Sequence, residues 1–399
     1  MRKRIMVIDC SVNTLKRIKN LGLKVICIEK KQKKNVKDLL NSEDIYYEID
    51  YKDLPLLKKE VGGILKQFPV DAILSFTEDG QMAVAELQSE YPLNSCKQSE
   101  QIKLFKNKYN LRNFLNSNNF SYVNVKLINS KEALIEFANE NGFPFILKPC
   151  IGTGSANIYK ISTFKDVYEL LDKEDPKALI AEDYLEGVEV SVETFSYNGK
   201  HYVVGITDKY TGPNFVEYGH SVPTSLKDEL TSNIKLFVLD FLNLTGVVFG
   251  PCHIEIKITA NGPKIIESHC RPGGDRIVDL HKLVSGIDIT QWTLDAIYSE
   301  NLEESYLSKR CPAVAIHFFR FEPNKRVTKL NIKTDDENIL RYECNLRVGD
   351  VTKDIKSSRD RHGFIMAKGE NVQEALQNCN SAIKNIEIEY VEEAIHDYQ

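Results

Sequence analysis

The first part of the chain alternates short apolar runs with a stretch of helical spacing. Apolar runs at Arg4–Asp9 and Leu23–Glu29 each predict a buried strand, and Thr14–Asn20 between them predicts a helix. A further apolar run at 70–76 predicts a later parallel strand. Strands that alternate with helices are typical of a small doubly wound α/β domain, which we expect to extend to about residue 95.

The turn after the first strand argues against a dinucleotide cofactor. It reads Cys10-Ser11-Val12-Asn13 and contains no glycine. A dinucleotide fold needs a glycine-rich turn there, because glycine lets the backbone approach the pyrophosphate closely. The turn therefore disfavours a nicotinamide oxidoreductase.

From Lys97 onward the pattern changes. Residues 103–116 predict a helix with a basic face, and residues 131–140 predict a second helix with Ser130 as its N-cap. Near the C-terminal end, an apolar strand is expected at 313–319 and another at 363–367, followed by a helix with an ordinary core face. The later part of the chain is therefore expected to be of α+β type.

A glycine-bearing loop joins two strands of the middle region. The strand Phe143–Pro149 contains Lys148 near its end, and the loop Gly152-Thr153-Gly154-Ser155 follows. Glycines let backbone amides approach phosphate oxygens, and a lysine at a strand end adds a fixed positive charge. The loop does not have the Walker A pattern, and an ordinary hairpin turn explains it equally well.

An acidic strand comes next, after the segment Glu182-Asp183-Tyr184-Leu185. From Val188 onward the period is two, so Glu189 and Glu193 share one face of the strand. A hinge with a hydrogen-bond acceptor, followed by a carboxylate within reach of a sugar, is what adenine and ribose recognition requires. An amphipathic strand with a solvated acidic edge would give the same pattern.

The most informative stretch is HIEIKITANGPKIIESHCRPGG, residues 253–274, in which Asn261-Gly262 is a hairpin turn between two alternating runs. The alternating polar residues are His253, Glu255 and Lys257 on the first run, and Glu267, His269 and Arg271 on the second. Side chains at every second position share a face, so all six are expected to point the same way. A polar sheet face held together by ion pairs is the simpler alternative.

Two facing glutamates suit a nucleotide-bound magnesium ion. Mg²⁺ prefers a few carboxylate oxygens together with waters and substrate phosphates, and Glu255 and Glu267 supply such oxygens. Arg271 at the strand end could stabilise charge on a transferring phosphoryl group or hold a substrate carboxylate. The hairpin therefore predicts phosphate chemistry.

The composition mainly argues against certain classes of partner. The 399-residue chain has a net charge of −5, which gives no sign of a nucleic-acid partner. No apolar stretch approaches the ~20 residues of a membrane span, so no membrane partner is expected. The nine cysteines form no C-x-x-C pair, which fits reduced thiols and a cytoplasmic location.

These motifs, taken in this order, resemble the ATP-grasp superfamily, and PKIIESHCRPGGDRI resembles the metal-and-arginine strand of its carboxylate–amine ligases that join amino acids. The resemblance implies an ATP-grasp fold, mixed α/β and α+β, with several domains. It places an N-terminal α/β domain at 1–96, an ATP-grasp domain at 97–306 with a nucleotide-binding lid around 112–185, and a C-terminal lid-like segment at 307–399.

The resemblance also implies roles for individual residues. Lys108 and Lys148 would reach the ATP phosphates under a flap formed by Gly152, Thr153, Gly154 and Ser155. The hinge that reads adenine would be Glu182, Asp183, Tyr184 and Leu185, with Glu189 on the ribose. The metal ligands would be Glu255, Glu267 and His269. Arg271 would contact the acyl phosphate, and His220 would lie near the substrate.

One position departs from the family pattern. The superfamily usually has asparagine two residues after the second glutamate, where this chain has His269. Imidazole is a poor ligand for a hard ion such as Mg²⁺. This puts a second magnesium in doubt or permits Mn²⁺, unless His269 simply forms a hydrogen bond with Glu267.

Other polar residues carry less information. Glu78 and Asp79 end a strand of the N-terminal domain, where open α/β sheets bind ligands, but only their position suggests a role. Asp275 would face an amine substrate or pair with Arg276.

The function implied by the resemblance is an ATP-dependent carboxylate–amine ligase. It would activate a carboxylate as an acyl phosphate, release ADP and phosphate, and form an amide or dipeptide with an amine, usually from an amino acid. The expected partners are small molecules, and the family permits a homodimer. The alternatives are a carboxylase that uses carboxyphosphate and a nucleotide-binding protein without turnover.

Overall fold

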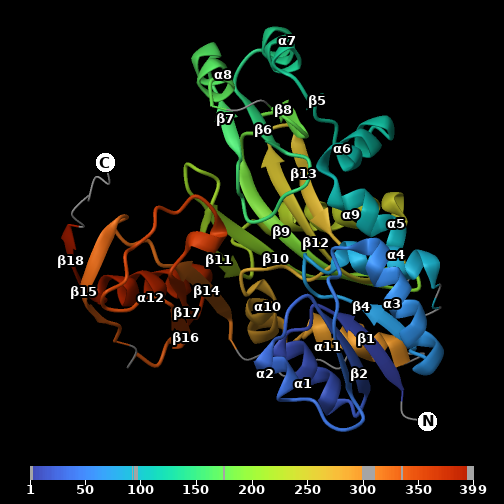
Figure 1. Ribbon diagram of the computed structural model, residues 1–399. Helices are drawn as coiled ribbons and strands as arrows, with labels where there is room; N and C mark the ends of the chain where they lie inside the picture. The colour runs from blue at the N-terminus through green and yellow to red at the C-terminus, as the bar shows by residue number, and fades with distance from the viewer. Residues whose placement is uncertain are drawn as a thin grey trace, which may run out of the picture.

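The computed structural model describes residues 3–91, 93, 98–173, 176–298, 311–333 and 336–392. Three parts surround a large central sheet: the N-terminal part at the lower right of Figure 1, a small sheet with two helices at the top, and the C-terminal part at the left. The predicted domain boundaries at 96/97 and 306/307 fall outside the described residues.

The N-terminal part is a four-stranded parallel sheet in the order β3-β2-β1-β4. Its strands are β1 (Arg4–Ile8), β2 (Lys24–Glu29), β3 (Ile45–Glu48) and β4 (Ala72–Leu74). The connecting helices are α1 (Val12–Asn20), α2 (Lys34–Lys37), α3 (Leu54–Gln67) and α4 (Gln81–Glu90). The apolar residues of β1 and β2 are buried, as both faces of a parallel sheet require. The predicted α/β class is confirmed.

Two helices, α5 (Ser99–Lys106) and α6 (Lys108–Ser117), lie where one helix was predicted over 103–116. Asn107 separates them in an extended conformation, and its side chain accepts hydrogen bonds from the amides of Tyr109 and Asn110. Asparagine is a good N-cap because its side chain satisfies these otherwise unpaired amides, so it starts a new helix here. Lys108 thereby becomes the first residue of α6.

The small sheet at the top of Figure 1 is antiparallel, in the order β5-β8-β6-β7. Its elements are β5 (Val125–Ile128), α7 (Lys131–Asn141), β6 (Phe145–Pro149), β7 (Tyr159–Ile161), α8 (Phe164–Leu171) and β8 (Leu179–Asp183). The two helices bury apolar residues against the sheet in a core of their own, which includes Phe137, Phe145 and Val167. The glycine-bearing loop joins β6 to β7, which are hydrogen-bonded neighbours.

The central sheet has eight strands in the order β13-β12-β9-β10-β11-β14-β17-β16. Its strands are β9 (Val188–Tyr197), β10 (Lys200–Thr211), β11 (Glu217–Val222), β12 (Phe249–Thr259), β13 (Gly262–His269), β14 (Ala313–Phe318), β16 (Ile339–Cys344) and β17 (Gly363–Gly369). Because β14 pairs with β11, the sheet continues from the middle of the chain into the C-terminal part. The helices α9 (Asp228–Thr245), α10 (Ile277–Ser285) and α11 (Ile289–Tyr298) pack against it.

The C-terminal part adds α12 (Val372–Lys384), which packs on β14 and β17 through Ala375, Cys379 and Ala382. A separate pair of strands, β15 (Lys325–Asn331) and β18 (Glu387–Glu392), lies beside it. A single 3₁₀ turn, Ser358–Asp360, precedes β17. Of the helices in the described ranges, none has the length and apolar character needed to cross a membrane.

Candidate active site

The predicted hairpin forms as β12 and β13. Glu255 lies directly opposite Glu267, and His253 directly opposite His269. The turn itself is displaced by one residue from the prediction, since Thr259 already pairs with Gly262, which begins β13 at a φ of +93°. The two glutamates are therefore neighbours on one face of adjacent strands.

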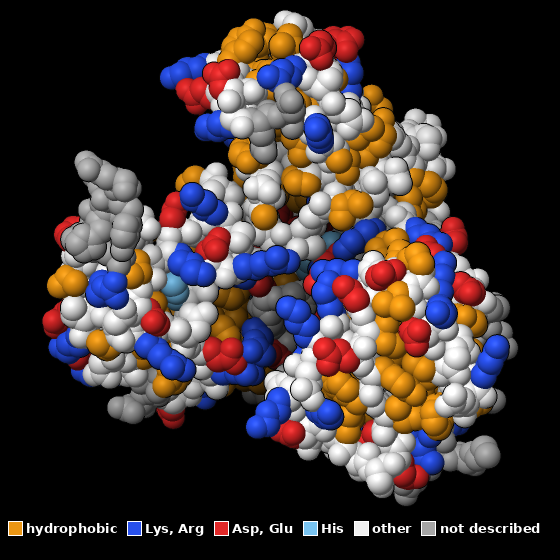
Figure 2. Space-filling view, in the orientation of Figure 1, with side chains coloured by type: hydrophobic (Ala, Val, Ile, Leu, Met, Phe, Trp, Pro, Cys, Tyr) orange, Lys and Arg blue, Asp and Glu red, His pale blue; other side chains and the backbone are white. Residues whose placement is uncertain are grey.

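Two adjoining cavities lie over this hairpin. The first is lined by Lys108, Lys148, the glycine loop, Glu182–Leu185, Glu189, Lys257 and Phe215, among others. The second is lined by Lys209, His220, His253, His269, Arg271, Asp275 and Arg359, among others. Both include Glu217, Glu255, Glu267 and the loop residues Thr153, Gly154 and Ser155. Figure 2 shows Lys and Arg side chains gathered around the hollow where the three parts of the molecule meet.

The six alternating polar residues of the hairpin all line one or both cavities. Their common orientation, predicted from the period of two, is confirmed. The segment after β13 is held in place by Glu193, which accepts a hydrogen bond from the Gly273 amide at 2.9 Å. A Cβ at position 273 would lie 2.8 Å from the Glu193 carboxylate, so a larger residue here would displace that side chain.

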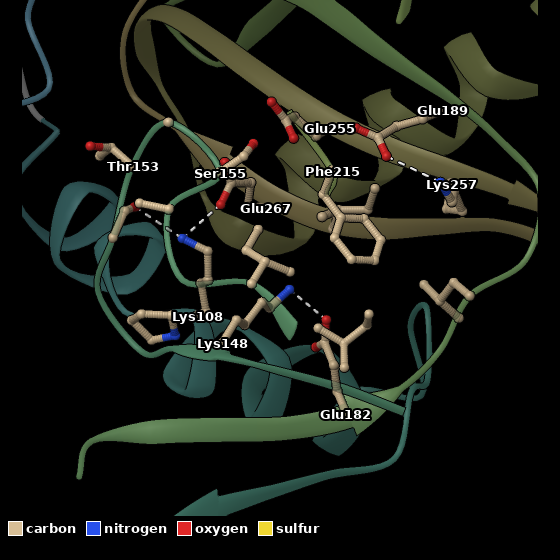
Figure 3. A pocket seen from close by; sticks show the side chains of 18 of the residues that line it. Lys108, Lys148, Thr153, Ser155, Glu182, Glu189, Phe215, Glu255, Lys257 and Glu267 are labelled. Atoms are coloured by element: carbon tan, nitrogen blue, oxygen red, sulfur yellow. Dashed lines mark hydrogen bonds and ion pairs between the residues drawn. The ribbon is translucent and has the colours of Figure 1, made fainter. Parts of the chain in front are cut away.

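Lys108 enters the first cavity from the start of α6. Its Nζ lies 2.7 Å from Glu267 and donates to the Gly152 carbonyl at 3.2 Å (Figure 3). Its backbone amide also donates a hydrogen bond to the Cys150 carbonyl, at the start of the glycine loop. The charge of Lys108 therefore joins the hairpin to the loop above it, although these segments lie far apart in sequence.

Lys148 reaches the same cavity from β6 and pairs with Glu182 on the neighbouring strand β8 (Figure 3). Burial alone would raise the pKa of the Glu182 carboxyl, but the charges of Lys148 and Arg112 outweigh it and lower the pKa. Arg112, on α6, also donates to the Ile265 carbonyl of β13 at 2.7 Å. Through Arg112, this buried group of charges connects the small sheet to the hairpin.

The hinge predicted between β8 and β9 lies at the edge of the first cavity, where Asp183, Tyr184 and Leu185 all contribute to the lining. The Asp183 carboxylate accepts hydrogen bonds from Asn124 and Asn141, so it stabilises the hinge. The Tyr184 ring packs under the Lys160 ammonium, 3.9 Å from Nζ to the ring centroid. The hinge thus lines the cavity in a conformation that these contacts hold in place.

Lys209 is a site residue that the sequence analysis missed. It lies on β10 with only 2% of its side chain exposed, and its Nζ is 2.8 Å from both Glu189 and Glu255 and 3.3 Å from Glu217. Burial alone would lower the pKa of Lys209, but these carboxylates raise it well above its usual value. Lys209 is therefore a fixed positive charge between the two cavities.

The carboxylates of the hairpin are ionised. Burial alone would raise the pKa of Glu255, but the Lys209 ammonium outweighs it and brings the pKa to about 2. Burial opposes ionisation of Glu267 too, and there Lys108 holds the pKa well below its usual range. Ionised oxygens on neighbouring strands are suitable ligands for a hard divalent cation.

Two residues that line the second cavity, His269 and Arg271, belong to a network centred on Glu78, which follows the last strand of the N-terminal sheet. Its carboxylate is 2.6 Å from Arg271 Nε and 3.0 Å from His269 Nδ1, and it also pairs with Lys106. Glu78, singled out from the sequence only by its position, therefore orients two of the predicted site residues. Asp79 instead pairs with Lys52 at the surface.

His269 has both ring nitrogens next to carboxylates, Glu78 at 3.0 Å and Glu267 at 3.1 Å. The alternative that His269 forms a hydrogen bond with Glu267 is thus what the structure contains. Among the described residues there is no group of three or more His, Cys, Asp or Glu side chains arranged to hold a metal ion. A magnesium site here would have to rest on Glu255 and Glu267 with oxygens supplied by a ligand and by water.

His220 lies on β11, with its Nε2 3.3 Å from Asp275. Asp275 pairs not with Arg276, as one reading of the sequence had it, but with Arg361 of the C-terminal part. Arg276 pairs with Glu343 and with Asp279 instead. The lining of the second cavity thus comes from the glycine loop, from the central sheet with the segment that follows β13, and from the C-terminal part.

Comparisons with known proteins agree with this geometry. Residues 141–279 match the ATP-grasp domain, and residues 325–391 match the L-amino acid ligase C-terminal domain 2. The chain contains an ATP-grasp domain. This confirms the resemblance seen in the sequence, and the ATP-grasp domain match includes the hinge, the hairpin and Arg271.

Among curated relatives, the L-arginine-specific L-amino acid ligase of Bacillus subtilis is 25% identical over 338 residues, 79% of each chain. An uncharacterized protein of Sinorhizobium fredii is 29% identical over 154 residues, 36% of this chain, and the alignment spans 31% of that relative's length. The crystal structure of an L-amino acid ligase from Bacillus licheniformis matches with a TM-score of 0.80 at 20% identity, over 98% of this chain and 99% of that one. The ATP-grasp fold follows from this likeness.

Proposed function

We propose that this ATP-grasp protein is an ATP-dependent carboxylate–amine ligase that forms an amide or dipeptide and releases ADP and phosphate. The observation that carries the proposal is the convergence on adjoining cavities of two lysines, a glycine loop, a hinge and a facing pair of ionised glutamates. Its substrates would be L-amino acids or related small acids, in line with the names of its relatives.

The first cavity would hold ATP. The hinge from Glu182 to Leu185 would contact adenine, and Glu189, which lies 3.1 Å from Lys257, would accept from the ribose. Lys108 and Lys148 would bind phosphate oxygens in exchange for their present carboxylate partners, and the loop 152–155 would cover them. Lys209 adds a third cation, held where the triphosphate would pass into the second cavity.

Mg²⁺ would be held by Glu255 and Glu267, and when bound it would neutralise charge on the phosphates. Their hard oxygen donors fit this ion. His269 would position Glu267 by its hydrogen bond, while direct ligation by His269 would call for a softer ion such as Mn²⁺.

The second cavity would carry the chemistry. A substrate carboxylate attacks the γ-phosphorus of ATP, and ADP leaves as an acyl phosphate forms. The substrate amine then attacks the acyl carbon, phosphate leaves, and the amine loses a proton. Arg271, held by Glu78, would stabilise charge on the transferred phosphoryl group, and His220 would lie beside the substrate. The protein would act by positioning and charge neutralisation, with no covalent enzyme intermediate.

The test is phosphate release from Mg-ATP across a matrix of paired amino acids and small carboxylic acids, with mass spectrometry of the positive wells. We expect equal amounts of ADP and phosphate together with a product whose mass is that of the two substrates less one water. Phosphate release that requires bicarbonate and gives no amide would favour the carboxylase alternative. Tight ATP binding with no ADP in any well would refute the ligase proposal.

Two further predictions stay proposals. A cytoplasmic location fits the cysteines of the described ranges, all of which are free thiols. A homodimer is the assembly expected from the family, and sedimentation or light scattering would test it.

A further inference from the structure

A short segment of the C-terminal part, residues 355–361, which we call the strap, contributes Ser358 and Arg359 to the lining of the second cavity. It leads into β17 and contains the 3₁₀ turn Ser358–Asp360. The turn is stabilised internally, because Asp360 accepts hydrogen bonds from the Ser357 amide at 2.9 Å and the Ser357 hydroxyl at 2.8 Å. This capping arrangement gives a short exposed segment a defined shape.

The strap is anchored at both ends. At its start, the Ile355 carbonyl accepts a hydrogen bond of 2.7 Å from the Asn214 side chain, in the loop between β10 and β11. At its end, Arg361 forms a two-pronged ion pair with Asp275 and lies 3.6 Å over the Phe318 ring. Only 8% of the Arg361 side chain is exposed. The strap is therefore held by an exposed hydrogen bond at its start and by a partly buried ion pair at its end.

Between these anchors the strap touches the glycine loop. The Ser358 amide donates to the Gly154 carbonyl at 3.1 Å, and Arg359 Nη2 lies 3.3 Å from the Thr153 hydroxyl. Gly154 has a φ of +69°, and a Cβ there would lie 2.6 Å from Ser358 Oγ. The loop and the strap thus approach each other backbone to backbone, and both line the second cavity.

Arg359 differs from the other arginines nearby. Arg361 pairs with Asp275, whereas Arg276 and Arg341 pair with Glu343. Arg359 lines the second cavity, yet within the described residues no carboxylate lies close enough to form an ion pair with it. The hydrogen bond that its side chain makes within the described ranges goes to a neutral hydroxyl, that of Thr153, at 3.3 Å. An arginine with most of its five donors unused, at the mouth of a cavity for anions, is suited to bind an oxyanion.

We propose that Arg359 binds the terminal phosphate of ATP when the glycine loop lies over it. This rests on the proposed function, which places the triphosphate beneath that loop. Two observations favour phosphate over a substrate carboxylate. Arg359 contacts Thr153, on the loop that would cover the phosphates. Near His220 and Asp275, where the substrate is expected, it is Arg361 that contacts Asp275, whereas Arg359 contacts Thr153.

The experiment compares nucleotides that differ in the terminal phosphate. Calorimetric titrations with Mg-ADP and with Mg-AMP-PNP, an ATP analogue that is not hydrolysed, would be run on wild type, Arg359→Ala and Arg359→Lys. Lys356→Ala is the matched control, because Lys356 lies on the same strap with 81% of its side chain exposed and does not line the cavity. Replacing an exposed side chain leaves the core intact, so folding is expected to be retained.

We expect Arg359→Ala to weaken AMP-PNP binding by roughly tenfold and to change ADP binding less than about twofold, since one charge-assisted contact is lost. Arg359→Lys should keep part of the wild-type preference for AMP-PNP over ADP, and Lys356→Ala should bind both nucleotides as wild type does. Equal weakening for both nucleotides would show a merely structural role and overturn the proposal. So would an unchanged preference for AMP-PNP, including the case in which only the KM for an amino acid rises.

This outcome is separable from the proposed function. If wild type prefers AMP-PNP through Arg359 but yields no amide product, the ligase proposal fails while the role of Arg359 stands. If wild type forms an amide and Arg359→Ala binds both nucleotides as wild type does, only the role of Arg359 fails.

Discussion

Two clusters in this molecule each place one lysine among several carboxylates, and they differ in what surrounds them. In the N-terminal part, Lys33 pairs with Asp9 and lies 2.9 Å from Glu29. In the central sheet, Lys209 meets Glu189, Glu217 and Glu255. The first cluster lies at the carboxyl end of a parallel sheet, a common place for ligands, and the second lies between two cavities.

The N-terminal cluster is satisfied by groups close to it. Thr77 donates to Asp9 at 2.6 Å, and the Cys10 amide donates to Glu29 at 2.7 Å. Asp9 itself has a φ of +56°, so the turn that lacks glycine is held by side-chain contacts. In the cluster around Lys209, three carboxylates contact one ammonium group, and the members of the cluster line the two cavities. The comparison indicates that a closed network supports the fold, whereas an open one is available to a ligand.

The largest effect is expected at Glu267, which lies opposite Glu255 of the open cluster and would hold the metal together with it. Glu267→Gln should reduce amide formation by about 10³-fold or more, because one ionised oxygen donor is lost beside Lys108. Arg271→Ala should likewise abolish product while leaving the fold intact. Product would be quantified by mass spectrometry, with circular dichroism to check folding. Near-normal turnover by Glu267→Gln would refute the metal assignment.

Removing the lysine at the centre of the open cluster should have the next largest effect. Lys209→Met leaves three carboxylates without their shared cation, so kcat/KM for ATP should fall by roughly 10²-fold. Steady-state kinetics at saturating amino acid would measure it. A variant that retains wild-type kcat/KM would assign Lys209 to the fold alone.

The equivalent change in the closed cluster should affect stability instead. Lys33→Met leaves Asp9 and the fully buried Glu29 without their cation, which should lower the free energy of unfolding by about 2 kcal/mol. This figure is below that for a fully buried pair because 39% of the Lys33 side chain is exposed. Urea unfolding would measure it, and kcat should stay within about threefold of wild type. A large loss of kcat without loss of stability would mean that the closed cluster acts in catalysis and not in support of the fold.

The smallest effect concerns a histidine next to the open cluster. His281 is buried, with Nε2 2.8 Å from the Thr207 hydroxyl, and burial lowers its pKa from 6.5 to about 4. The neutral form is favoured in the folded state, so this stability is present above about pH 6.5 and is lost as pH falls toward 4. Between about pH 7 and pH 5.5 the loss should be about 1 kcal/mol.

His281→Gln should remove that part of the pH dependence. Urea unfolding of wild type and variant at both pH values would isolate it, since all other titrating groups are shared. An identical pH slope in the two proteins would mean that His281 does not titrate in this range.

Local patterns were sufficient for much of the site. The period of two in 253–274 predicted the facing glutamates, because alternation in a strand fixes which side chains share a face. The glycine loop and hinge were found for the same reason, as each is a contiguous segment. Asn107 shows the limit of this reasoning, since one capping side chain divided a helix that spacing alone would continue.

Long-range partners were not predictable in this way. Lys209 is a single lysine in the strand Lys200–Thr211, and nothing near it in sequence shows that three carboxylates from other strands meet it. Glu78 was noted for its place at a strand end, but its contact with Arg271, 193 residues away, depends on how the N-terminal part packs.

The sequence by itself determined the α/β and α+β classes, the ATP-grasp resemblance and the face on which Glu255 and Glu267 lie. These follow from periodicity and contiguous motifs, which act over a few residues. Only the tertiary structure decided that β14 extends the central sheet and that the strap brings Arg359 to the glycine loop. Such contacts join segments about 100 to 200 residues apart, where packing and charge pairing across the whole molecule set the neighbours.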